Sequence, residues 1–164
     1  MRVFIGIKIS DGFKKEAVGI MENNKNLGLR FIKPKNLHIT LVPPWEEKNV
    51  ERIKRKLEKI DFNPFWISFS NIYLNDRNRV IWIEAEQTSK DLIKLRKELF
   101  SELGLEEEKR PFRPHLTIAR YGKEIAKDEF KEIVSAFHFK EEVVKITLFK
   151  SELGPNEANY FELN

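Results

Sequence analysis

Short apolar runs recur along the chain and predict its strands. These runs are rich in Val, Ile, Phe and Leu and are bounded by Gly, Pro, Asn or charged residues, which is typical of strands. They cover residues 3–9, 29–32, 37–42, 65–74, 80–86, 143–149 and 160–163, together with a strand around His115. The loop at residues 75–79 is polar, so its two flanking strands are expected to form a hairpin.

Four other segments repeat apolar residues every three or four positions, which is the spacing of one helix face. The first is expected to follow a Ser10 cap, and the second to open at Trp45 after the double proline at residues 43–44 ends a strand. The third starts near Thr88 and ends at Gly104, and the fourth lies near residues 128–137. The residues expected to face inward are Phe13, Ala17, Ile20 and Met21; Val50, Ile53, Leu57 and Ile60; Leu92, Leu95, Leu99 and Leu103; and Phe130, Ile133, Val134 and Phe137.

The two halves of the chain match each other at a constant spacing. His38 and His115 are 77 positions apart, and Lys33-Pro34 has the same spacing from Arg110-Pro111. Several helix positions repeat with it too, which indicates an internal duplication with repeats at about residues 2–75 and 79–152. We therefore predict one α+β domain over residues 1–164. It would be bilobed, with two pseudo-symmetric lobes of antiparallel sheet and helices and an active-site cleft between them.

Each repeat carries a His-x-Thr sequence within its predicted strand, His38-Ile-Thr40 and His115-Leu-Thr117. Residues two apart in a strand point to the same face, so each His projects together with its Thr. The apolar residues between and after them face the opposite way, into the core. The duplication thus predicts two polar pairs directed at one shared cavity.

Composition excludes several classes of protein. The chain has no cysteine, so disulfides and thiolate metal sites are absent, as is typical of an intracellular, here cytoplasmic, protein. No apolar run approaches the roughly 18 residues of a membrane span, and the N-terminal run is interpreted as a first strand. The 30 Lys and Arg against 26 Asp and Glu give a net charge of only +4, which permits an anionic partner without requiring one.

Two histidines and two threonines in this arrangement suit phosphodiester cleavage. That reaction needs one group to take a proton from the attacking oxygen and another to protonate the leaving oxygen, and a histidine can do either near neutral pH. The hydroxyls of Thr40 and Thr117 can bind the non-bridging phosphate oxygens, and nearby cations can assist them. The candidate cations are Lys33, Lys35, Arg110 and Arg113. Arg113 is preferred, because it shares the face of His115 if the strand extends back past Pro114.

Other interpretations compete with catalysis. A single histidine in a strand is more often a packing residue, and only the matched pair favours a catalytic role. A metal site with two histidines lacks a third ligand beside either motif, so no metal or other cofactor is expected. The third histidine, His138, has no counterpart in the other repeat and is interpreted as structural. The tryptophans are interpreted as core residues, although one or two could stack a base at the rim of the cleft.

The motifs resemble those of the two-histidine (2H) phosphoesterase superfamily. The residues that carry the resemblance are Phe-Arg-Pro-His-Leu-Thr-Ile-Ala-Arg at 112–120, Asn-Leu-His-Ile-Thr at 36–40 and Met-Arg-Val-Phe-Ile-Gly-Ile at 1–7. The most similar branch is that of the 2′-5′ RNA ligase and RNA 2′,3′-cyclic phosphodiesterase proteins. The resemblance covers essentially the whole chain.

The resemblance implies a metal-independent reaction that opens an RNA 2′,3′-cyclic phosphate to a 2′-phosphate. It makes His38 the proton donor to the departing 3′ oxygen and His115 the proton acceptor that activates water. Thr40 and Thr117 would bind the phosphate. The partner would be RNA or a nucleotide with a 2′,3′-cyclic phosphate, and the protein is expected to be a monomer. Two alternatives remain: 2′-5′ ligation of RNA halves, and a nucleotide- or RNA-binding module without turnover.

Overall fold

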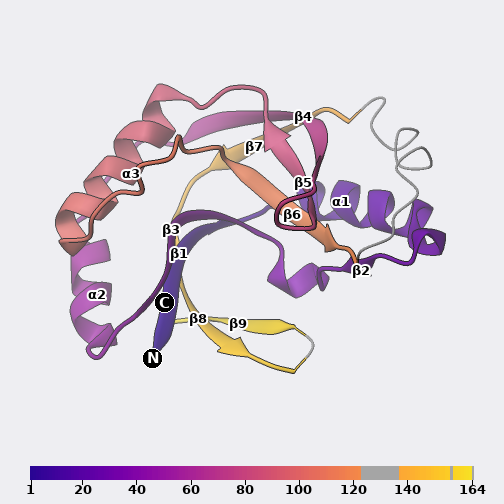
Figure 1. Cartoon of the computed structure of the whole chain (residues 1–164). Coiled ribbons are helices and arrows are strands. Elements are labelled where there is room, and N and C mark those ends of the chain that lie inside the picture. The colour runs from indigo at the N-terminus through magenta and orange to yellow at the C-terminus, as the bar shows by residue number, and fades with distance from the viewer. Residues whose placement is uncertain (123–136, 156, 164) are drawn as a thin grey trace.

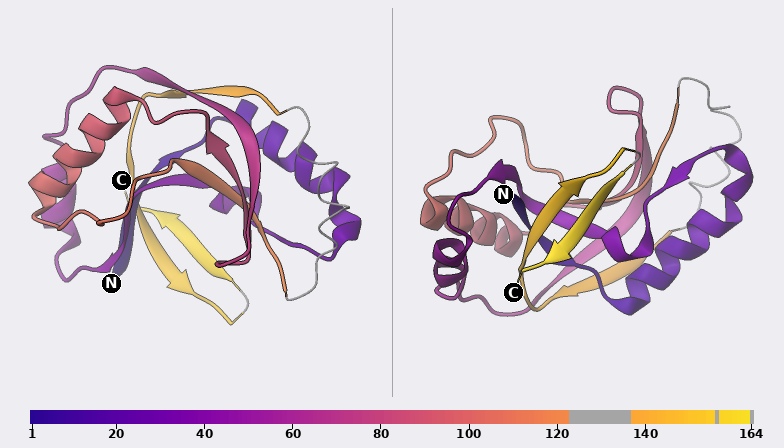
Figure 2. Two further views of the ribbon diagram at one scale, coloured as in Figure 1. Left: turned by 45° about the horizontal axis from the view of Figure 1, so that its top comes forward. Right: turned by 90° about the horizontal axis from the view of Figure 1, so that it is seen from below.

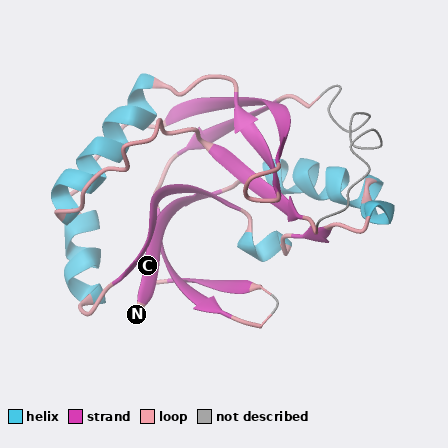
Figure 3. Ribbon diagram, viewed as in Figure 1, coloured by secondary structure: helices cyan, strands magenta, loops and turns pink. Residues whose placement is uncertain are grey.

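The computed structural model describes residues 1–122, 137–155 and 157–163, and in these it forms one antiparallel sheet flanked by three α-helices (Figures 1 and 3). The predicted α+β class is confirmed. The helices are α1 (Asp11–Asn23), α2 (Val50–Leu57) and α3 (Lys90–Leu103), with short 3-10 turns η1 (Lys25–Leu27) and η2 (Pro34–Asn36). The strands are β1 (Arg2–Lys8), β2 (Arg30–Phe31), β3 (His38–Glu46), β4 (Phe65–Asn75), β5 (Val80–Ala85), β6 (His115–Arg120), β7 (Phe139–Val143), β8 (Thr147–Leu153) and β9 (Ala158–Glu162).

The order of the strands is symmetric about the centre of the sheet. It runs β7-β4-β5-β6-β3-β1-β8-β9, and the short β2 pairs with β6 off this path. On either side of the β3–β6 junction, a motif strand is followed outward by β1 or β5 and then by β8 or β4. The sequence offset of 77 relates β1 to β5 and β3 to β6, so the two halves of the sheet have matching order.

Neither half of the sheet is built from one contiguous half of the chain. The strand β4 comes from the first half of the sequence but pairs with β5, since the two form the predicted local hairpin. The strand β8 comes from the second half and pairs with β1. The predicted lobes therefore differ from the sequence repeats, because each lobe takes strands from both.

The helices are exchanged in the same way. Figure 2 shows α1 at one side of the sheet and the pair α2–α3 at the other. The α1 ring of Phe13 stacks on Phe139 of β7 at 4.8 Å between centroids and lies 4.9 Å from Phe69 of β4. Helix α3, from the second half of the chain, contacts β3 instead. Each half-sheet is thus covered by a helix from the other half of the sequence.

The helix ends follow the predicted signals. Ser10 accepts a hydrogen bond from the backbone N–H of Phe13 at 3.2 Å, and Ser89 accepts one from Leu92 at 3.0 Å. Gly104 ends α3 in the left-handed conformation at φ 69°. No helix in the described part of the chain is long and apolar enough to cross a membrane.

The double proline does not end the third strand, and that prediction was wrong. β3 continues to Glu46, and α2 begins only at Val50, with Asn49 as its cap. The pairing with β1 passes from Val42 to Trp45 and leaves both prolines without a register partner. Proline lacks a backbone N–H, so it is tolerated in a strand at such an irregularity.

The C-terminal part of the sheet also differs from the prediction. A strand was expected at residues 143–149, but β7 ends at Val143 and β8 begins at Thr147. β7 was missed because its inward residue Glu141 is a carboxylate, which breaks the apolar pattern. This side chain is 2% exposed and accepts hydrogen bonds from the backbone N–H and the hydroxyl of Ser10. The helix expected near residues 128–137 lies almost wholly outside the described residues, although the Phe137 ring does stack on Phe13.

A buried arginine connects α3 to the strand of the first motif. Arg96 is 5% exposed, and its guanidinium carbon lies over the rings of Phe100 and Phe112, at 4.5 and 4.6 Å from their centroids. Its Nε donates to the carbonyl of Leu41 in β3 at 3.1 Å, and its Nη1 lies 2.9 Å from Glu107. One side chain therefore fixes both β3 and the loop that leads into β6.

Replacing this arginine should cost stability. We expect Arg96→Leu to lower the free energy of unfolding by about 2–4 kcal/mol, because it leaves the Leu41 carbonyl buried without a donor and removes two ring contacts. The matched control is Arg110→Leu in the same region, whose side chain is 72% exposed and whose loss should cost less than about 1 kcal/mol. Urea unfolding measures both variants, and equal losses would contradict the assignment.

Candidate active site

The two His-x-Thr motifs meet at the centre of the sheet. Ile39 of β3 and Leu116 of β6 are antiparallel partners, and both are fully buried in the core. Continuing this register by one residue in each direction places His38 opposite Thr117, and Thr40 opposite His115. Neighbouring residues in a strand point to opposite faces, so all four polar residues share the face that is turned away from the core.

The two imidazoles are oriented by equivalent contacts. His38 Nδ1 lies 2.7 Å from the carbonyl of Asn36, and His115 Nδ1 lies 2.7 Å from the carbonyl of Arg113. In both motifs the carbonyl belongs to the residue two positions earlier. A carbonyl only accepts, so Nδ1 carries the hydrogen and Nε2 of the neutral ring holds a lone pair. His38 Nε2 is 3.1 Å from Thr40 Oγ1, which can donate to it.

Aromatic rings surround the first histidine more fully than the second. The His38 ring lies 4.7 Å from Phe4, 5.0 Å from Tyr160 and 5.8 Å from Phe149. Among the described residues, the ring that lies against His115 is that of Trp82, at 4.6 Å. Trp82 was predicted from the sequence to be a core residue, but its ring also contacts a histidine of the site.

A glycine allows β1 to approach the first motif closely. A Cβ added to Gly6 would lie 2.7 Å from the carbonyl oxygen of Ile39 and 3.5 Å from the His38 ring. Because the nearer contact is with backbone, β3 would have to move to accept it. Gly6 therefore helps to fix where His38 lies.

Burial lowers the pKa of both histidines. For His38 it lowers the pKa from 6.5 to about 4, against the opposing effect of the Asn36 carbonyl, and the charge of His115 lowers it further. For His115 burial is again the main cause of a lowered pKa, and the Arg113 carbonyl and the Glu84 carboxylate partly offset it. The influence of His115 on His38 agrees with two imidazoles that face one site.

A cavity of about 480 Å³ opens beside the first motif. It is lined by His38 and Thr40 of β3, by Thr117 of β6, and by the β8–β9 hairpin, including Ser151 and Tyr160. The structure thus brings residues of both motifs to one cavity. His115 is not among the described residues that line it, so the cavity lies on the His38 side of the site.

Two arginines line this cavity, and the sequence did not single them out as cations for the site. Arg120 belongs to β6 and Arg2 to β1. The pKa of Tyr160 reflects both: burial raises it, and the charges of Arg120 and Arg2 oppose that rise. Glu157 also lines the cavity, but its carboxylate is paired with Lys33, so the two arginines make the cavity suited to an anion.

A β-bulge accounts for the position of Arg120. Strict alternation from His115 would place Arg120 on the core side of β6. The pairing with β5 instead passes from Thr117 directly to Ala119, so Ile118 has no register partner on β5. An extra residue in a strand reverses the alternation after it, so Arg120 returns to the face of His115. The same irregularity occurs at Leu41 in β3, 77 positions earlier.

Arg113, the cation that the sequence favours for binding the phosphate, is paired with a carboxylate of the protein in this structure. Its Nη2 and Nε lie 2.8 and 2.9 Å from Oε1 of Glu84, and the guanidinium lies 5.9 Å from the Tyr73 ring centroid. It is absent from the described lining of the cavity, where Arg120 lies instead. Arg113 contributes its backbone carbonyl, which holds His115. Lys33, another candidate cation, forms an ion pair with Glu157.

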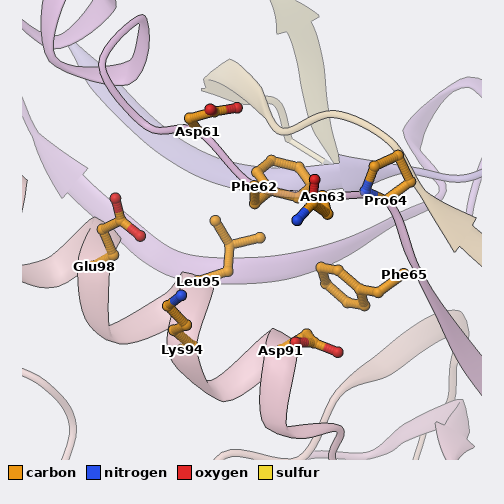
Figure 4. A pocket seen from close by; sticks show the side chains of 9 residues that line it. All are labelled: Asp61, Phe62, Asn63, Pro64, Phe65, Asp91, Lys94, Leu95 and Glu98. Carbon is orange, nitrogen blue, oxygen red and sulfur yellow. The ribbon is translucent and has the colours of Figure 1, made fainter.

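A second hollow lies away from both motifs. It measures about 230 Å³ and lies between α3 and the segment that leads into β4, with Phe62 and Leu95 facing each other across it (Figure 4). Its charged side chains are of both signs, and no motif residue contributes to its described lining. Nowhere in the described chain do three His, Cys, Asp or Glu gather as a metal site would require. His138 lies 3.1 Å from Glu86 and does not line the cavity.

The chain is thus an α+β protein with a paired His-x-Thr site at the centre of one sheet and an arginine-lined cavity beside it. It belongs to the 2′-5′ RNA ligase superfamily, whose family model matches residues 26–155. The family to which the motifs pointed is therefore confirmed. The superfamily is enzymatic, so the prediction that the chain is an enzyme is confirmed as well.

Comparison with individual proteins agrees with this assignment. The RNA 2′,3′-cyclic phosphodiesterase of Methanocaldococcus jannaschii is 33% identical over 98% of this chain and 96% of its own length. The RNA 2′,3′-cyclic phosphodiesterase of Archaeoglobus fulgidus is 30% identical over 73% of this chain and 72% of its own. The crystal structure of E. coli LigT in apo form has the same fold, with a TM-score of 0.81 at 21% identity, over 99% of this chain and 94% of that one.

The imidazole environments can be tested by NMR titration. In the folded protein we expect His38 to titrate with a pKa of about 4 and His115 below 6.5, because burial disfavours both charged forms. The nitrogen shifts of the neutral rings should show hydrogen on Nδ1. The control is the same protein in urea, where both should titrate near 6.5. A His38 pKa at or above 6.5 in the folded protein would contradict the burial argument.

Proposed function

We propose that the protein hydrolyses RNA 2′,3′-cyclic phosphodiester ends to 2′-phosphates by metal-independent acid–base catalysis. The observation that carries this proposal is the pair of imidazoles, each held through Nδ1 by the carbonyl two residues earlier. This orientation leaves Nε2 of each ring as the atom that can exchange a proton. Two relatives that align with most of this chain, both named RNA 2′,3′-cyclic phosphodiesterase, support the substrate class.

The reaction needs one proton taken and one given. The oxygen of a water molecule attacks phosphorus while His115 Nε2 takes its proton. The bond from phosphorus to O3′ breaks, and His38 Nε2 gives a proton to the departing oxygen. The product carries a free 3′-hydroxyl and a 2′-phosphate, and each histidine is left in the protonation state in which the other began. Thr40, Thr117 and Arg120 bind the non-bridging oxygens, where negative charge accumulates.

The position of the cavity supports this assignment of roles. Attack and departure occur on opposite sides of phosphorus, and the departing O3′ belongs to the ribose of the substrate. The nucleoside therefore needs room beside the acid, whereas the base needs room only for water. His38 lines the cavity and His115 does not, which favours His38 as the acid.

The protonation of His38 depends on the substrate. With a pKa of about 4, its ring is neutral near pH 7 in the free protein. A donor must be protonated, and a bound cyclic phosphate supplies the negative charge that favours the charged ring. Substrate binding and proton uptake at His38 are therefore coupled.

Removing either imidazole should abolish most of the activity. We expect His38→Ala and His115→Ala each to lower the rate of 2′,3′-cyclic AMP hydrolysis by about 10²–10⁴-fold, because each removes one proton transfer. His138→Ala is the matched control: its side chain is 62% exposed and bonded to Glu86, and it should retain wild-type activity. Circular dichroism would confirm that all three variants are folded.

Further measurements on the same protein separate the alternatives. Full activity in excess chelator is expected, and its loss would reject a metal-independent reaction. Release of a 3′-phosphate would reverse the leaving group and with it the proposed roles. Joining of cleaved tRNA halves would indicate ligation, and tight nucleotide binding without turnover would indicate a binding module.

The pH dependence follows from the two lowered pKa values. Activity requires one histidine protonated and the other neutral, and that state is most populated between their two pKa values. Both pKa values are lowered from 6.5 in the free protein, so kcat/KM should peak below pH 6.5 and fall above it. The bound phosphate raises both pKa values, so the kcat profile should lie at higher pH. Stopped assays from pH 3.5 to 9 measure both profiles, and a kcat/KM maximum above pH 7 would contradict the assignment.

A further inference from the structure

A buried carboxylate lies beside the second histidine of the site. Glu84 of β5 is the register partner of His115 of β6, and register partners on neighbouring strands point to the same face. Glu84 is only 7% exposed. Burying a carboxylate is costly unless other groups in the protein satisfy it, so the partners of Glu84 indicate what it does at this place.

Three nitrogen atoms hold this carboxylate. Oε1 lies 2.8 and 2.9 Å from Nη2 and Nε of Arg113, and Oε2 accepts a hydrogen bond from Nε1 of Trp82 at 2.8 Å. Both partners also contact His115. The Trp82 ring lies 4.6 Å from the imidazole, and the Arg113 carbonyl lies 2.7 Å from its Nδ1. Glu84 therefore fixes the two residues that orient His115.

The charge of Glu84 also acts on His115. Its carboxylate is buried and poorly screened by water, whereas the side chains of Arg110 and Arg113 are 72% and 61% exposed. Burial has the largest effect on the pKa of His115 and lowers it. Of the charged groups, Glu84 has the largest effect and raises that pKa, whereas Arg110 and Arg113 lower it. His38 faces the site from β3 and, with a pKa of about 4, is neutral near pH 7.

The first histidine has a different neighbour at the equivalent place. The register partner of His38 is Lys8 of β1, whose side chain is 47% exposed and whose ammonium lies 2.6 Å from Glu162 of β9. The anionic partner therefore lies beside the histidine proposed as the base, and a cationic one beside the histidine proposed as the acid. An anion beside a base favours proton uptake, so this difference agrees with opposite roles.

We propose that Glu84 is a positioning residue for the base: it holds His115 through Trp82 and Arg113, and it stabilises the charge that His115 gains when it takes a proton from water. The inference rests on the proposed function for the role of His115. Glu84 is not among the described residues that line the cavity, so it acts through His115 and not on the substrate. Its loss should therefore slow the chemical step and leave substrate binding unchanged.

The first test removes the charge and keeps the shape of the side chain. We expect Glu84→Gln to lower kcat for 2′,3′-cyclic AMP by about 10-fold with an unchanged KM. Loss of a negative charge disfavours the imidazolium, so the pKa of His115 in an NMR titration should fall below its wild-type value. Glu84→Asp keeps the charge and should hold that pKa close to the wild-type value.

The second test removes the other member of the ion pair. Arg113→Met keeps the backbone carbonyl that holds His115 but takes away a cation, so the pKa of His115 should rise. The two substitutions therefore shift the same pKa in opposite directions. A merely structural role of the Glu84–Arg113 pair would not produce shifts of opposite sign.

A matched control is available two residues further along the chain. Glu86→Gln removes the same charge from a side chain that lies 3.1 Å from His138. It should leave kcat, KM and the pKa of His115 unchanged. Circular dichroism checks that every variant is folded.

The outcomes separate this inference from the proposed function. A folded Glu84→Gln with wild-type kcat and His115 pKa overturns the inference, and so does a raised KM at unchanged kcat, which would make Glu84 a binding residue. If the wild type does not hydrolyse 2′,3′-cyclic AMP, the proposed function fails, and the titrations still decide whether Glu84 governs His115. Shifts of opposite sign support it, and unshifted values reject it. Where Glu84→Gln does not fold, an unchanged His115 pKa in Arg113→Met rejects it.

Discussion

The site depends on one backbone pairing, that of Ile39 with Leu116 at the junction of β3 and β6. Both side chains are fully buried, so the hydrophobic core itself sets the register of the two strands. A slip of one residue would turn each His and Thr toward the core and bring apolar residues to the cavity. Burial of Ile39 and Leu116 therefore stabilises the fold and also holds the two imidazoles in their relative positions.

Much of this arrangement can be predicted from the sequence, and each part that cannot be predicted has a specific physical cause. The prediction that His38 and His115 share one site follows from the alternation of side chains within each strand and from the repeated spacing of the two motifs. Arg120 was missed because a bulge at Ile118 reverses the alternation, and an unpaired residue leaves no mark on an apolar pattern. β7 was missed because two bonds from Ser10 satisfy a buried carboxylate, Glu141. Contacts of that kind join residues far apart in sequence.

The two histidines occupy related but unequal surroundings. Equivalent carbonyls orient them, yet the side chains of the residues that supply those carbonyls hold different partners. Asn36 binds the backbone of β9, which walls the cavity, whereas Arg113 binds Glu84 of β5. On the His38 side, β9 therefore helps to enclose a cavity. On the His115 side, the Arg113–Glu84 ion pair lies beside the imidazole instead. Such a difference is what two opposite roles, acid and base, require of two similar positions.

The exchange of strands between the two halves means that neither repeat completes its half of the sheet alone. Strand β8 of the second repeat completes the half-sheet that β1 begins, and α1 packs on β7 of the second repeat as well as on β4 of its own. Each half of the sheet therefore holds strands from both repeats, and each repeat supplies one histidine to the same site. The two halves therefore share one frame and differ in what surrounds their histidines, since His38 lines an enclosed cavity and His115 is not among its described lining residues.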